Sequence, residues 1–175
     1  MHRALGGLVA ALLAAAPGVA QAQRMGEHEI GVDAALAWVK PSGADGRLTI
    51  LTPVDVRLGF ASRGPLSLEP RFSMFLQADG GTRYSIDPGL NVLYRLGGTA
   101  VNHNQYLTFG ADIDLEKAGP SGAIFALNGG YGMRRPWGAG AFRTEFFFRY
   151  AFEDTQLGAP NTFSLGVRAG LSMWH

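Results

Sequence analysis

The sequence predicts an all-β protein: an eight-stranded antiparallel transmembrane β-barrel with up-and-down meander topology, preceded by an N-terminal signal peptide. Three features of the 175 residues support this prediction: an apolar leader, eight segments of alternating polarity, and an excess of thirteen Arg over two Lys. This length provides one domain. The absence of Cys excludes a disulfide scaffold and a Cys-ligated metal site. A formal net charge of +1 gives no nucleic-acid signature.

Residues 1–22 have the organisation of a secretory signal peptide, which leaves residues 23–175 as the mature outer-membrane barrel domain. A short basic start precedes an apolar run over residues 5–16. This run is shorter than the roughly 20 residues that a membrane-spanning helix needs. The Ala-Gln-Ala sequence that follows fits the small-x-small cleavage pattern, so cleavage is expected before Gln23. An uncleaved N-terminal membrane anchor is the alternative interpretation.

Eight segments of the mature chain alternate apolar and polar residues, the pattern of a β-strand with two different faces. These segments cover 30–38, 47–60, 66–76, 83–96, 107–115, 123–133, 142–152 and 163–173. Turn-rich stretches separate them at 39–46, 61–65, 77–82, 97–104, 116–121, 134–140 and 153–161. Pro53, Pro70 and Pro88 fall inside predicted strands. Because proline cannot donate to a strand ladder and a closed barrel has no free edge, local β-bulges are expected there. The alternative is that one of these strands starts or ends at other residues.

The two faces of these strands differ in the same way throughout. No charged residue falls on the apolar face, whereas eight Arg and eight acidic residues fall on the opposite face. An apolar face turned inward would give a soluble, lipocalin-like barrel, and one turned outward would give a membrane barrel with a charged lumen. The Phe- and Tyr-rich apolar face favours the membrane barrel. The preference for Arg does so too, because Arg pairs with carboxylates bidentately in enclosed sites.

The polar face is therefore predicted to fill the lumen with Arg–carboxylate pairs. An eight-stranded barrel has an interior that side chains can fill, so no large open pore is expected. The predicted lumen network comprises Arg57, Arg71, Arg95, Arg149, Arg168, Asp55, Glu69, Asp87, Asp112 and Glu145. The spacing of Asp112 and Asp114 leaves open a cation site or acid–base chemistry. No metal site and no cofactor is predicted.

The leader, the eight alternating segments and the closing sequence FSLGVRAGLSMWH resemble the small eight-stranded outer-membrane barrels of Gram-negative bacteria, the OmpA/OmpX-like class. The resemblance implies residence in the outer-membrane lipid, termini in the periplasm and help from the barrel-insertion machinery. It also implies a C-terminal insertion signal, here Phe163, Leu165, Val167, Leu171, Met173 and Trp174. The chain ends on His175, whereas the class commonly ends on a lipid-facing aromatic residue.

The function predicted from the sequence is a structural or surface-interaction role without enzymatic activity, with at most slow passage of small solutes. A monomer with no nucleic-acid partner is expected. The alternative is a barrel that binds or transports a small hydrophobic ligand, either a lipocalin-like protein or a transporter of apolar compounds. A lipid-modifying enzyme would need a His beside a Ser and an acid at the lipid-facing rim. His28, His103 and His175 do not provide this arrangement.

Overall fold

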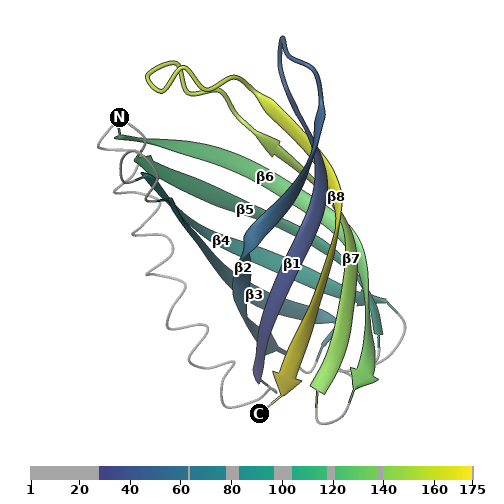
Figure 1. Cartoon of the computed structure of the whole chain (residues 1–175). Coiled ribbons are helices and arrows are strands. Elements are labelled where there is room, and N and C mark those ends of the chain that lie inside the picture. Colours follow the sequence, from purple (N-terminus) through teal and green to yellow (C-terminus); the bar gives the residue numbers. More distant parts are fainter. Residues whose placement is uncertain are drawn as a thin grey trace.

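The computed structural model is a closed antiparallel barrel of eight strands (Figure 1). It describes residues 28–62, 64–77, 83–96, 104–117, 121–137 and 140–174, so the predicted signal peptide lies outside the described residues. The strands are β1 (His28–Pro41), β2 (Arg47–Ala61), β3 (Leu66–Gln77), β4 (Arg83–Leu96), β5 (Asn104–Lys117), β6 (Ser121–Trp137), β7 (Gly140–Ala151) and β8 (Thr162–Trp174). Each strand pairs with the next, and β8 closes on β1. The predicted eight-stranded meander is confirmed.

The two ends of the barrel carry different parts of the chain. The first residues of β1 and the last residues of β8 pair at one end, which we call the terminal end. The opposite end, which we call the loop end, carries residues 42–46 and 152–161 (Figure 1). Asp154 and Ala159 exchange two backbone hydrogen bonds of 3.0 and 2.9 Å within the second of these segments. Within the described residues no helix is long and apolar enough to cross a membrane.

The apolar face of the strands points outward. On β7 the side chain of Phe146 is 51% exposed, whereas its neighbour Phe147 points into the lumen and is 3% exposed. The same alternation on β1 leaves Ile30 exposed and Glu29 buried. This arrangement is the membrane-barrel solution. It is the reverse of a lipocalin-like barrel, whose apolar side chains would fill the interior.

Several strands run beyond the predicted segments, and at the C-terminal ends of β1 and β6 the added residues include charged ones. β1 continues to Pro41 and β6 continues to Trp137, although the alternation predicted ends at residues 38 and 133. Lys40 and Arg135 are exposed on the outer side near the barrel rims, so the outer face does carry charge at its edges. Arg134, predicted to lie in a turn, instead points into the lumen and is 2% exposed.

The prediction of a bulge is confirmed at Pro53. Asp33 on β1 lies opposite Asp55, whereas Ala35 lies opposite Leu51. Two steps along β1 therefore correspond to four along β2, and the two extra residues fall around Pro53. The insertion of two residues preserves the alternation of faces on either side.

The prediction of bulges at Pro70 and Pro88 is wrong. In the β3–β4 ladder Pro70 pairs with Leu90 and Phe72 pairs with Pro88 in one continuous register. The β2–β3 and β4–β5 registers are also unshifted on the two sides of each proline. A strand residue directs its N–H to only one neighbouring strand. Each proline therefore costs the ladder one donor without changing the register.

Candidate functional site

The lumen is divided into a filled part and a hollow part. The filled part lies toward the terminal end and is called the lumen plug: Glu29, Asp33, Arg57, Glu69, Tyr106, Arg134, Arg143, Glu145 and Arg168. The hollow part lies toward the loop end and is a cavity of about 480 Å³, which we call the vestibule. The prediction of a filled lumen therefore describes the plug, whereas the vestibule is hollow although Arg–carboxylate pairs line it.

Arg57 is the centre of one half of the plug. Its side chain is fully buried, and it donates from Nε to Asp33 Oδ2 at 2.5 Å and from Nη1 to Glu29 Oε1 at 2.5 Å. Its Nη2 also donates to Ser172 Oγ at 3.1 Å. Gly31 makes room for this guanidinium, because a Cβ there would overlap it. Arg57 thus ties β2 to β1 and β8 inside the barrel.

Arg143 is the centre of the other half. Its two Nη atoms donate to Glu69 and Glu145, and its Nε donates to the Tyr106 hydroxyl. Tyr106 in turn donates to Glu145 Oε2 at 3.0 Å. The guanidinium groups of Arg134 and Arg143 lie 4.9 and 4.8 Å from the centroid of the Tyr106 ring. This geometry adds cation–π attraction to the ion pairs.

The charges of the plug balance. Arg134 Nη2 donates to Glu29 Oε2 at 2.7 Å, which joins the two halves, and Arg168 Nη1 donates to Glu145 Oε1 at 3.1 Å. The four acidic residues are Glu29, Asp33, Glu69 and Glu145, and the four basic residues are Arg57, Arg134, Arg143 and Arg168. A buried charge is tolerated when it is paired and hydrogen-bonded. The plug therefore fills this part of the lumen with four acidic and four basic side chains, without net charge.

Gly132 on β6 provides a test of the packing of the plug. A Cβ at this position would overlap the Tyr106 ring, which is completely buried and cannot move into solvent. We expect Gly132→Ala to destabilise the refolded barrel by about 1–3 kcal/mol, the usual cost of overpacking. Urea unfolding in lipid vesicles measures this change. The double variant Gly132→Ala/Tyr106→Leu should lose the overpacking cost, and a Gly132→Ala variant as stable as the wild type would contradict this packing.

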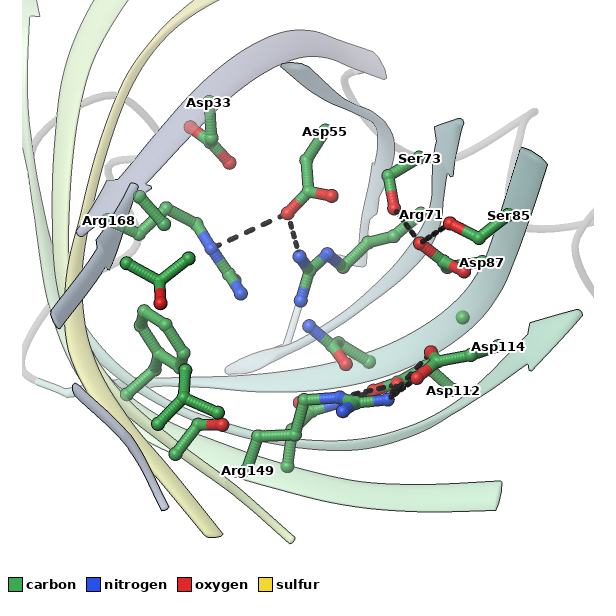
Figure 2. A pocket seen from close by; sticks show the side chains of 18 of the residues that line it. Asp33, Asp55, Arg71, Ser73, Ser85, Asp87, Asp112, Asp114, Arg149 and Arg168 are labelled. Carbon is green, nitrogen blue, oxygen red and sulfur yellow. Dashed lines mark hydrogen bonds and ion pairs between the residues drawn. The ribbon is translucent and has the colours of Figure 1, made fainter. Parts of the chain in front are cut away.

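Side chains from several strands line the vestibule (Figure 2). Its acidic residues are Asp33, Asp55, Asp87, Asp112 and Asp114, and its basic residues are Arg71, Arg149 and Arg168. Arg71 donates to Asp55, and Arg168 Nε lies 3.6 Å from the same carboxylate. Arg149 donates from Nε to Asp112 Oδ2 at 2.8 Å and from Nη2 to Asp114 Oδ1 at 2.7 Å. The acid pair at 112 and 114 is thus bridged by an arginine.

The predicted network residues all face the lumen, in three places. Arg57, Glu69, Glu145 and Arg168 belong to the plug, and Asp55, Arg71, Asp87, Asp112 and Arg149 line the vestibule. Arg95 lies beside the β2–β3 turn, where it donates to Ser67 Oγ at 3.0 Å and to the Ser62 carbonyl at 2.8 Å. Asp87 departs from the expected pairing with Arg. Its Oδ2 accepts from the Ser73 and Ser85 hydroxyls at 3.1 and 3.5 Å.

Sequence reasoning left five plug residues out of the predicted network. The alternation places Glu29, Asp33 and Arg143 on the polar face, but the predicted ion-pair network did not include them. Tyr106 and Arg134 lie just outside the predicted strand segments. Extending the alternation by one residue at the start of 107–115 and at the end of 123–133 would have placed both in the lumen.

The proposed insertion signal lies on the outer face of β8. Phe163, Leu165, Val167, Leu171 and Met173 are all exposed there, and the backbone of Trp174 pairs with Glu29. Their role in insertion stays a prediction. Of the histidines, His28 lies with its ring centroid 5.7 Å from that of Phe60, and His103 and His175 lie outside the described residues. Across the described part of the chain, no group of three or more His, Asp or Glu residues is arranged to hold a metal ion.

Comparison with known proteins places the fold. No protein-family model and no curated protein matches the sequence. Neisserial surface protein A (NspA) superimposes with a TM-score of 0.64 at 13% identity, over 85% of this chain and 98% of that protein. The outer membrane protein OprG of Pseudomonas aeruginosa gives 0.52 at 13% identity, over 86% and 96%. Ail, the attachment invasion locus protein of Yersinia pestis, gives 0.51 at 14% identity, over 85% and 99%.

These likenesses are too low in sequence identity to show more than the fold. The fold is that of the small eight-stranded outer-membrane barrels, and the resemblance to the OmpA/OmpX-like class is confirmed at that level.

Proposed function

We propose that this chain is a closed barrel of the Gram-negative outer membrane, which conducts no solutes and serves a structural or surface-interaction role at its loop end. The lumen plug is the observation that carries this proposal. Arg57, Arg134 and Arg143 are 0–2% exposed, and each is held by carboxylates from other strands or from its own. Opening a path through the terminal end would separate several buried ion pairs, each of which is costly to break.

The outer surface supports the membrane location. Closure of the barrel leaves no unpaired strand edge for lipid to meet, and the exterior of the barrel is apolar. In the proposed orientation both termini lie in the periplasm and the loop end faces outward, after export by the signal peptide of residues 1–22 and assembly by the barrel-insertion machinery. The names of two proteins with this fold, a surface protein and an attachment invasion locus protein, agree with a role at the cell surface.

The alternative of a hydrophobic cargo is less well supported. The vestibule lining includes eight charged side chains together with Ser, Thr and Asn, and its larger apolar side chains are Val39, Ile50 and Phe147. Sites for apolar ligands are lined mainly by apolar side chains. Phe147 is the large aromatic residue in the vestibule lining, and the Arg168 guanidinium lies 4.7 Å from its ring centroid. An enzymatic activity is not part of the proposal.

Conductance tests the closed lumen. In planar bilayers the wild-type protein should give no stable openings of nanosiemens size, because the plug blocks the terminal end. Replacing Glu69 and Arg143 together by Ala should produce detectable current, since this removes the Arg143 connections to Glu69, Glu145 and Tyr106. Arg149→Ala is the matched control: it changes the vestibule, leaves the plug intact and should stay silent. Repeated large openings of the wild type would overturn the proposal.

A further inference from the structure

The vestibule contains a carboxylate that differs from the others. Each of its arginines is paired with acid: Arg71 with Asp55, Arg149 with Asp112 and Asp114, and Arg168 with Glu145. The Asp33 carboxylate accepts a hydrogen bond from Arg57, which belongs to the plug. Asp87 instead accepts hydrogen bonds from Ser73 and Ser85 through Oδ2 (Figure 2). Its Oδ1 is buried and has no hydrogen-bond partner among the described residues.

A second, independent feature of the same cavity is Asn91. Its side chain is fully buried and lines the vestibule. Neither its Oδ1 nor its Nδ2 has a hydrogen-bond partner within the described part of the chain. A buried amide without partners is costly and rare, so its presence calls for an explanation. A ligand in the cavity that donates to Asn91 Oδ1 would supply one of the missing hydrogen bonds.

Asp87 and Asn91 belong to one strand and one face. Four residues apart on β4, they are separated by roughly 13 Å along the strand. Between them on this face lies Gly89, which contributes no side chain to the space. A Cβ there would lie 3.1 Å from Asp112 Cβ, so a larger residue would narrow the cavity. Its volume of about 480 Å³ is within the range of small-molecule sites.

We propose that the vestibule binds a small organic cation, whose protonated amine lies against Asp87 and which also hydrogen-bonds to the Asn91 amide. An ammonium group offers three donors and no acceptor, which suits the free acceptors of these two side chains. All three arginines already pair with carboxylates, although Arg71 Nε and Arg168 Nε are buried without a hydrogen-bond partner among the described residues. An anion would have to compete with those carboxylates. The lining as a whole contains five Asp and three Arg, so its charge also favours a cation.

Isothermal titration calorimetry tests this site. The detergent-refolded barrel is titrated with 1,4-diaminobutane at low ionic strength. Saturable one-to-one binding is expected, and neutral 1,4-butanediol of the same chain length should not bind. Asp87→Asn should weaken diamine binding at least tenfold. The matched control is Asp45→Asn, because Asp45 is exposed in the 42–46 segment at the same end of the barrel and is not part of the vestibule lining. This control should change the affinity less than twofold.

Asn91→Leu separates a ligand contact from a structural role. The substitution removes an unpartnered buried amide and conserves volume, so the urea midpoint should rise while diamine affinity falls several-fold. Heat-modifiable gel migration shows that each variant is folded. The proposal is overturned if diamine binding to the wild type does not saturate, or if Asp87→Asn binds the diamine like the wild type. It is also overturned if Asp45→Asn loses as much affinity as Asp87→Asn, or if Asn91→Leu leaves diamine binding unchanged. Equal binding of Mg²⁺ would overturn the assignment to an organic cation.

This test is independent of the proposed function. Binding is measured in detergent without a membrane or a current, so its failure leaves the closed barrel standing. A conducting wild-type protein would overturn the closed barrel and would leave the diamine result unaffected.

Discussion

Arg143→Met is expected to destabilise the refolded barrel by about 3–5 kcal/mol, the usual cost of removing one partner from a buried ion-pair network. The substitution leaves Glu69 and Glu145, each only 1–2% exposed, without the guanidinium that joins them. Arg168 still reaches Glu145 at 3.1 Å, but the contacts of Glu69 with Arg57 and Arg134 are longer, at 3.7 Å. Urea unfolding in lipid vesicles, followed by tryptophan fluorescence, measures the loss.

Arg149→Met is the matched control for this experiment. Arg149 also bridges two carboxylates, but its side chain is 22% exposed and Asp112 and Asp114 are 15% and 20% exposed. Water in the vestibule can solvate the two aspartates after the change, so a loss of about 1 kcal/mol is expected. Similar losses for Arg143→Met and Arg149→Met would show that water reaches the plug as freely as the vestibule. That result would contradict a sealed terminal end.

The alternation of residues was sufficient to predict the eight strands and the direction of their faces, because lipid and lumen impose opposite requirements on successive side chains. The ends of the strands were harder to predict. Arg134 precedes Pro136, which is typical of a turn, yet the ladder with β7 continues through Pro136 opposite Ala141. Pro70 and Pro88 were expected to bulge because proline cannot donate to a ladder, but each proline omits a single N–H and the register continues on both sides.

The contacts inside the lumen were predicted only in part. Parity placed Arg57 in the lumen, but its partners Glu29 and Asp33 depend on the stagger between β1 and β2. Arg134 on β6 reaches Glu29 on β1, a strand that is not its neighbour in the sheet, and no local spacing encodes such a contact. The vestibule was missed for a similar reason. Small residues such as Ala35, Ser73 and Gly89 line the same cavity, but the sequence does not show this because their relative heights depend on the strand register.

Phe146→Arg is expected to destabilise the barrel in lipid vesicles by about 2–4 kcal/mol, the cost of a cation near the bilayer midplane. Phe146 is 51% exposed on the outer face near the middle of β7, where it pairs with Val167 of β8. Phe146→Leu should have little effect, because a leucine side chain is also at home in hydrocarbon. The comparison therefore isolates the charge from the loss of the ring, and urea unfolding of both variants measures it.

Met173→Arg tests whether the cost depends on depth. Met173 is 68% exposed on the same outer face, six residues beyond Val167 on β8 and close to the terminal end. Six residues correspond to roughly 20 Å along a strand, or roughly 14 Å along the membrane normal at a tilt of about 45°. An arginine at this depth can extend its side chain to the lipid headgroups. The exposed Arg135 of β6 lies near the same rim of the barrel. A cost of about 0–1 kcal/mol is therefore expected for Met173→Arg. Equal losses for Phe146→Arg and Met173→Arg would mean that the apolar face is not immersed in a bilayer, because only a bilayer makes the penalty for charge fall from its centre to its edge.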